Sequence, residues 1–123
     1  TPWASATLGL SYGSSSWYAV LSDFCVLRKG AVLAVSSAQL ASLAIKEEVD
    51  PQVMGGWQVH AEVTGFADYV AETDEEALQA IRTFLSYMPS HHKEAPPVHP
   101  VPEGLGANMA NIAKLLPERR TQV

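Results

Sequence analysis

Backbone N–H groups between residues 9 and 17 are the strongest candidates for chemistry in this sequence. Gly9 and Gly13 frame a tight turn, and the serines at 14–16 lead into an apolar run that begins at Trp17. The first N–H groups of a helix have no intrahelical partner, and they attract negative charge. The turn therefore predicts an anion site or an oxyanion hole, with a capped turn that binds nothing as the alternative.

Four histidines are the other side chains that could do acid–base or metal chemistry. His60 stands among Gly, Trp and Glu residues, so it is either a proton donor or acceptor near neutral pH or a hydrogen-bonded structural residue. His91, His92 and His99 lie in a proline-rich segment without cysteines or a set of carboxylates, which makes a poor cage for a metal ion. We therefore predict no metal site.

The composition limits the functions open to the chain. Its 123 residues, 47% of them hydrophobic, suit one domain with a real core. A net charge of −5, with eight Lys and Arg spread along the sequence, argues against nucleic-acid binding. No apolar run reaches the roughly 18 residues of a membrane helix, so we expect no membrane association. Cys25 is the only cysteine and has apolar neighbours, which predicts a buried thiol and fits a reducing, cytoplasmic location.

The spacing of apolar residues predicts a layered α/β fold in which both faces of the sheet are covered. Strands are expected at 3–10, 24–27, 31–35 and 66–71, and helices at 17–22, 38–48, 51–55 and 73–88. Three helices have recognisable starts, namely Ser36-Ser37, Asp50-Pro51 and the capping box that Thr73 opens. Residues 57–65 show no clear period and indicate a loop or a broken helix, and a last short helix is expected at 107–116.

Three motifs together resemble one protein family. The run from Gly9 to Phe24 looks like that family's pattern of a glycine, three residues, Gly-Gly, a helix and Asp-Phe. The second motif consists of Gly55-Gly56, His60, Thr64-Gly65 and Ala67-Asp68, and the third is the run from Leu85 to Ser90. On these residues the chain resembles the carboxyltransferase (β) subunit of biotin-dependent acyl-CoA carboxylases, of the propionyl-CoA and acetyl-CoA carboxylase type.

The resemblance implies a fold and a division of the chain. The fold class is α/β, as part of one crotonase-like domain, the ββα superhelix of Clp protease and crotonase. Residues 1–89 are then a partial N-terminal carboxyltransferase domain, 90–104 a proline-rich arm, and 105–123 a short helix and tail leading to a C-terminal domain missing from this sequence. We expect the arm to lie extended along a surface and to tie the domain to its neighbours.

The resemblance also implies a reaction. In this family the carboxyl group of carboxybiotin is transferred to the α-carbon of an acyl-CoA through an enolate, whose oxygen is held by backbone N–H groups. Carried onto this sequence, the donors are Gly13 and Ser14, although the family usually has a second glycine where Ser14 stands. His60 is implied to be a pocket or structural residue, because biotin itself moves the proton. The implied substrate-binding residues are Tyr12, Ser15 and Ser37.

Cofactors and partners follow from the same resemblance. Biotin is the cofactor, carried by a partner protein or domain, and an acyl-CoA is the substrate. The implied partners are a biotin carboxylase or biotin carrier subunit and further copies in a homo-oligomer. Two alternatives stay open. One is a biotin-dependent acyl-CoA decarboxylase subunit, and the other is a non-catalytic scaffold domain in which Ser14 has ended catalysis.

Overall fold

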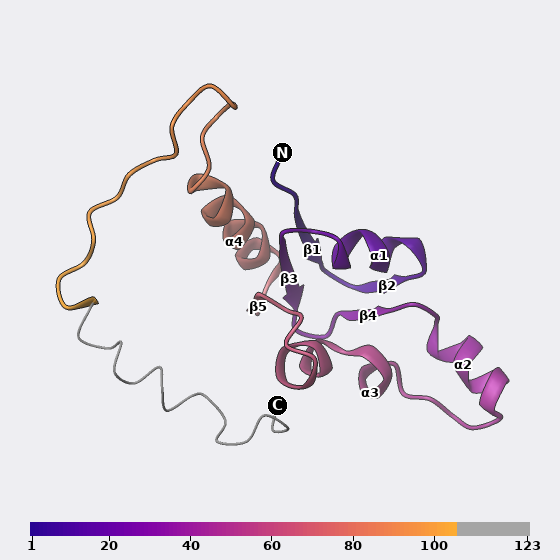
Figure 1. The fold of residues 1–123 in the computed structure, drawn as a ribbon. Coiled ribbons are helices and arrows are strands. Elements are labelled where there is room, and N and C mark those ends of the chain that lie inside the picture. Colours follow the sequence, from indigo (N-terminus) through magenta and orange to yellow (C-terminus); the bar gives the residue numbers. More distant parts are fainter. Residues whose placement is uncertain (106–123) are drawn as a thin grey trace, which may run out of the picture.

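The computed structural model describes residues 1–105 and is built on a repeated unit of two strands and a helix (Figure 1). The first unit consists of β1 (Ala4–Thr7), β2 (Leu10–Tyr12) and α1 (Ser14–Val20). The second consists of β3 (Phe24–Arg28), β4 (Val32–Ala34) and α2 (Ala38–Ile45). The chain continues through α3 (Pro51–Gly55), the π-helix η1 (Val59–Val63), β5 (Tyr69–Ala71) and α4 (Asp74–Ser86).

The strands pair in parallel and fall into two sheets. The three-stranded sheet has the order β1-β3-β5, with Ala4 beside Phe24 and Val26 beside Tyr69. The two-stranded sheet pairs β2 with β4. In each unit the first strand therefore joins one sheet and the second strand joins the other, which confirms the predicted ββα pattern.

The beginning of the chain corrects two sequence predictions. One strand is expected over residues 3–10, whereas the chain changes sheet near Gly9 and forms β1 and β2 instead. Helix α1 begins at Ser14 and not at Trp17, with Gly13 at the N-cap position (φ 64°, ψ −131°) and no side-chain cap. Gly13 reaches this conformation because it has no Cβ, so the turn forms without a serine cap.

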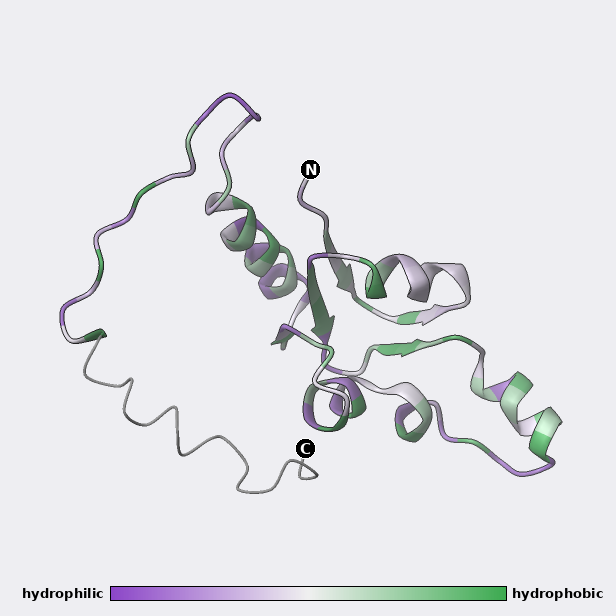
Figure 2. Ribbon diagram, in the orientation of Figure 1, coloured by the Kyte–Doolittle hydropathy of each residue, from purple (hydrophilic) through white to green (hydrophobic). Residues whose placement is uncertain are grey.

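Strand β3 lies in the core and is covered on both faces. The buried cluster on one side consists of Ala19, Cys25, Leu27 and Leu33, and that on the other side of Val26, Ala71 and Ala77. Phe24 also stacks on Phe84 of α4, with ring centroids 4.7 Å apart. Figure 2 shows β3 and β4 as hydrophobic runs, which is typical of parallel strands.

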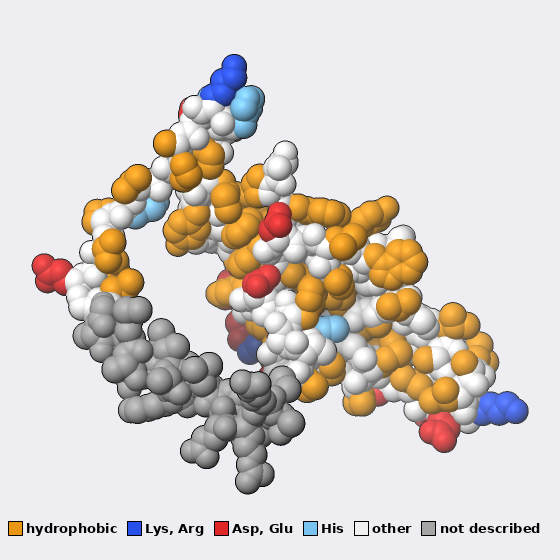
Figure 3. All heavy atoms as spheres, viewed as in Figure 1, with side chains coloured by type: hydrophobic (Ala, Val, Ile, Leu, Met, Phe, Trp, Pro, Cys, Tyr) orange, Lys and Arg blue, Asp and Glu red, His pale blue; other side chains and the backbone are white. Residues whose placement is uncertain are grey.

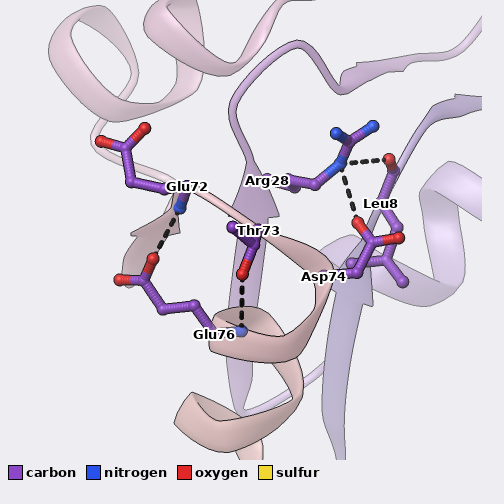
Figure 4. Close-up of polar contacts among 6 residues, drawn as sticks. All are labelled: Leu8, Arg28, Glu72, Thr73, Asp74 and Glu76. Atoms are coloured by element: carbon purple, nitrogen blue, oxygen red, sulfur yellow. Dashed lines mark hydrogen bonds and ion pairs between the residues drawn. The ribbon is translucent and has the colours of Figure 1, made fainter.

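Helix α4 begins at the predicted capping box (Figure 4). Thr73 Oγ1 accepts a hydrogen bond from Glu76 N (3.2 Å), and Glu76 Oε2 accepts one from Glu72 N (2.8 Å). The hydroxyl of Tyr69 donates to Glu76 Oε1 at 2.6 Å. The Tyr69 hydrogen bond, followed by that from Glu72, lowers the pKa of Glu76, and the same bond raises the pKa of Tyr69.

Arg28 at the end of β3 contacts both the residue that follows β1 and the first turn of α4 (Figure 4). Arg28 Nε lies 2.9 Å from Leu8 O and 2.9 Å from Asp74 Oδ1. These contacts join the chain after β1, the end of β3 and the first turn of α4. Because the side chains of Arg28 and Asp74 are partly exposed, solvent weakens the ion pair, and its main effect is on geometry.

The predicted arm is exposed along its whole length, residues 90–104, and runs away from both sheets (Figure 1). The ring of His99 in the arm lies edge-on to Tyr87, at 6.1 Å between centroids. Its role in tying the domain to neighbours stays a prediction, as do the domain boundaries. The helix predicted at 107–116 lies outside the described residues.

Candidate functional site

Two helices begin at one edge of the two-stranded sheet (Figure 1). Strands β2 and β4 are parallel, with Tyr12 beside Ala34, so their carboxyl ends meet at the same edge. Helix α1 follows β2 directly after Gly13, and α2 follows β4 after Ser37. The N-termini of both helices therefore lie at the same end of the sheet, where the helix dipoles favour a bound negative charge.

The N–H groups of the Gly-Ser turn are of two kinds. Gly13 N–H donates to Val35 O (3.0 Å), and Ser16 N–H donates to Gly13 O (3.1 Å). Among the described residues, the N–H groups of Ser14 and Ser15 have no acceptor, as is usual in the first turn of a helix. The assignment of Gly13 as an oxyanion donor is thus corrected, because the sheet occupies its N–H. The free pair belongs to Ser14 and Ser15.

The predicted substrate-binding residues lie near this end of the sheet, but the hydroxyl groups of the two serines bond to the backbone of the turns. Ser15 Oγ donates to Tyr12 O (2.7 Å), and Ser37 Oγ accepts from Leu40 N (3.1 Å) as the N-cap of α2. Ser15 also lines a cleft of about 260 Å³ between β1 and α1. The structure brings Tyr12 and Ser15 together and places Ser37 on the neighbouring helix start. Their role toward a substrate stays a prediction.

A larger apolar pocket of about 960 Å³ lies between α1, the end of β4 and η1. Its hydrophobic lining consists of Trp17, Val20, Leu21, Leu33, Ala34, Val35, Ala41, Met54 and Phe66. Ser16, Ser36, His60 and Thr64 are the polar residues of the wall. The sequence did not predict this pocket, because its lining comes from segments that are far apart in the chain. The available signal was the apolar run from Trp17 to Leu21 on a short helix.

Large hydrophobic side chains remain exposed around this pocket. They gather over α1, α2 and α3 in the space-filling view (Figure 3). The exposed set in this region consists of Trp17, Tyr18, Val20, Leu21, Val35, Leu40, Leu43, Ile45 and Val53. An apolar surface of this extent is typical of a region that another protein segment covers.

His60 projects from η1 into the wall of the pocket. Its Nε2 lies 2.7 Å from Leu33 O, and its Nδ1 lies 3.3 Å from Thr64 Oγ1. Because a carbonyl oxygen only accepts, the short contact assigns the ring proton to Nε2. The edge of the ring also meets Phe66, at 5.9 Å between centroids and 76° between planes.

Other candidate centres of chemistry are less suitable. In the described part of the chain, no three His, Cys, Asp or Glu side chains gather as a metal site requires. No helix in residues 1–105 is both long and apolar enough to cross a membrane. Cys25 is 1% exposed, and burial raises the pKa of its thiol, so it is a structural residue and not a nucleophile.

The chain is similar to known carboxylases and carboxyltransferases. The carboxyl transferase domain family matches residues 1–123. An uncharacterized carboxylase of Bacillus subtilis is 35% identical over 92 residues, which are 74% of this chain and 18% of that protein. The carboxyltransferase subunit of a propionyl-CoA carboxylase from Haloferax mediterranei is 31% identical over 97 residues, which are 78% of this chain and 19% of that protein.

A solved structure with the same fold is that of transcarboxylase 12S, crystallised with hydrolysed methylmalonyl-coenzyme A. The likeness has a TM-score of 0.71 at 27% identity, and it covers 81% of this chain and 20% of the other. The chain thus spans about a fifth of the length of these relatives. From the family match over residues 1–123 and the ββα fold, the chain belongs to the carboxyl transferase domain family, as part of a carboxyltransferase subunit.

Proposed function

We propose that this chain forms part of the active site of a biotin-dependent carboxyltransferase that acts on an acyl-CoA. The observation that carries the proposal is the pair of helix starts at the ends of β2 and β4, where the N–H groups of Ser14 and Ser15 have no acceptor among the described residues. The family match and the propionyl-CoA carboxylase relative support the substrate class.

The reaction needs stabilisation of one oxygen atom. When the α-proton of an acyl-CoA leaves, the electron pair of the C–H bond moves onto the thioester oxygen and gives an enolate. The N–H groups of Ser14 and Ser15 donate to that oxygen without reorganisation, as do the donors of known oxyanion holes. The enolate electrons then form the new C–C bond to CO2, which carboxybiotin would release by breaking its N–C bond, and the thioester carbonyl is restored.

The residue types suit this role. Ser14 stands where the family usually has glycine, but every residue except proline keeps the N–H that the enolate requires. Biotin, carried by a partner, would supply the carboxyl group, and its nitrogen, freed by the loss of CO2, would take up the α-proton. The donors described here fit the substrate oxygen, and no contact with biotin is assigned to them.

The assembly is part of the proposal. A biotin carboxylase or biotin carrier subunit delivers the carboxyl group, and further copies of the carboxyltransferase complete the enzyme. The exposed apolar side chains over α1, α2 and α3 support a neighbour on that face. Hexamer assembly is named for the transcarboxylase 12S structure.

The test is a carboxyl-transfer assay on the full-length subunit. Acetyl-, propionyl- and butyryl-CoA are offered with carboxybiotin, and each carboxylated product is also offered with free biotin to measure the reverse direction. Product formed from an acyl-CoA supports the carboxylase reading. Activity only in the reverse direction indicates the decarboxylase, and no exchange in either direction indicates the scaffold domain.

A further inference from the structure

Strand β4 has one edge that no strand covers among the described residues. It pairs with β2 on its other side only. On the open edge, Trp57 N donates to Ala31 O at 3.0 Å, and His60 Nε2 lies 2.7 Å from Leu33 O. The segment that leads into η1 thus takes the place of a neighbouring strand, and the imidazole ring supplies a donor that a strand backbone would otherwise provide.

We infer that His60 is a positioning residue of the Ser14–Ser15 amide site, acting through β4. On the open edge of β4, the Nε2–H of His60 donates to Leu33 O. Two residues further along the chain, Val35 O accepts the backbone N–H of Gly13. Gly13 directly precedes the two free N–H groups. The expected effect of His60 on catalysis rests on the proposed function. The structural link from His60 through β4 to Gly13 does not.

The surroundings fix the ring in this position. The Nδ1 contact to Thr64 Oγ1 and the edge contact with Phe66 hold it on two further sides. Gly55 approaches the same carbonyl so closely that an added Cβ would lie 2.6 Å from Leu33 O. Since Leu33 is only 3% exposed, its carbonyl has little access to water if the imidazole donor is lost.

The same contacts argue against His60 as an acid or base. Its Nε2–H is committed to Leu33 O, and Nδ1 faces the hydroxyl of Thr64. A role in positioning needs a donor at this place and no titrating group. Glutamine can meet that need, because its side-chain amide also donates, whereas it cannot take up a proton near neutral pH.

The experiment compares His60→Gln with His60→Phe in the full-length carboxyltransferase. His60→Phe keeps a ring without a donor, and Glu62→Gln, at an exposed position of the same helix, serves as a control that leaves the His60 contacts in place. Hydrogen exchange measured by mass spectrometry reports on peptides covering residues 10–17 and 32–36, with an α4 peptide as internal reference. Steady-state kinetics with the acyl-CoA reports kcat and KM separately.

We expect exchange in both peptides to be about tenfold faster in His60→Phe, with α4 unchanged. Its kcat falls about 10- to 100-fold, while KM changes little, because a misplaced amide is felt mainly by the enolate. His60→Gln and the control Glu62→Gln stay within about threefold of wild type in both measurements.

Two results overturn the inference. One is wild-type exchange in residues 10–17 of His60→Phe. The other is a large loss of kcat in His60→Gln with normal exchange, which indicates a chemical role for the imidazole. If His60→Phe does not fold, His60→Ala, which is smaller and also lacks a donor, replaces it in both measurements. If the proposed function is wrong, the wild-type enzyme shows no carboxyl transfer. Hydrogen exchange in His60→Phe, compared with that in the wild type, then still tests the link from His60 to Gly13.

Discussion

Gly13 donates its backbone N–H to the carbonyl oxygen of Val35 across 3.0 Å, and this bond connects the two strands that end at the candidate site. The bond makes Gly13 a structural residue of the site, because it fixes where α1 begins relative to the end of β4. The free N–H groups of Ser14 and Ser15 take their positions from it. The roles of these adjacent residues can therefore be separated by mutation.

We expect Gly13→Ala to destabilise the protein by about 1–3 kcal/mol, because its φ of 64° with ψ of −131° lies in a region that only glycine populates readily. The measurement is thermal melting of the full-length subunit. Gly9→Ala is the matched control, since its added Cβ meets no atom within 4 Å and its φ is not positive. Equal melting temperatures in the two variants would show that the turn relaxes freely.

Ser14→Pro tests the oxyanion assignment directly. Ser14 is the first residue of α1, a position where proline is tolerated, so the substitution removes one N–H and leaves the helix in place. We expect kcat to fall about 100- to 1000-fold. Gly13→Pro is unsuitable, because it also breaks the Val35 bond and forces φ to about −65°.

The control for this prediction is Ser14→Ala, which keeps the N–H and removes only the hydroxyl. Among the described residues that hydroxyl makes no hydrogen bond, so we expect Ser14→Ala to retain most of the wild-type kcat. Folding of both variants is checked by circular dichroism. Normal turnover in a folded Ser14→Pro enzyme would mean that the Ser14 N–H does not face the enolate.

Cys25 should resist thiol reagents in the native protein. It is buried in β3, and burial raises the pKa of its thiol, so little thiolate forms and reagents reach it only when the strand opens. We expect alkylation of the peptide that carries Cys25 to be slow in buffer and fast in denaturant, as followed by mass spectrometry. Rapid labelling without denaturant would contradict the burial of this strand.

The cap of α4 should weaken in acid. The pKa of Glu76 is lowered in the folded protein, chiefly by the hydrogen bond from Tyr69, so its stabilising contribution is present above its ordinary pKa of about 4.5. That contribution disappears as the pH falls through the lower, folded-state value. We therefore expect Glu76→Gln to lower the melting temperature slightly at neutral pH, with the difference vanishing in acid.

Glu75→Gln is the control for the cap, because Glu75 lies in the same first turn and is exposed. It removes the same charge from the helix start without touching the bonds from Tyr69 and Glu72. We expect a smaller effect than that of Glu76→Gln at neutral pH. If the melting temperature of Glu76→Gln fell further below that of the wild type as the pH was lowered, the pKa of Glu76 could not be lowered by folding.

Local features of the fold could be predicted because their causes are local. Ser37, Asp50 and Thr73 cap the helices that follow them, since each side chain accepts an N–H only two or three residues away. These caps can be predicted because the acceptor side chain and the donor N–H lie within one short segment of sequence.

Features that depend on distant pairing could not be predicted. The predicted strand at 3–10 divides into β1 and β2 because the two parts pair with different strands, β3 and β4. The types of residues 3–10 do not by themselves indicate this division. The turn at Gly13 was correctly placed, but its occupied N–H depends on Val35, which lies 22 positions away.

The register of the sheets also bears on the order in which the chain assembles. Ala4 pairs with Phe24, 20 positions later, whereas Val26 pairs with Tyr69, 43 positions later. Closing the longer loop costs about 0.7 kcal/mol more chain entropy, so pairing within the first two ββα units precedes the arrival of β5. Until then, the buried strand β3 has one edge open, and we expect aggregation during synthesis to begin there.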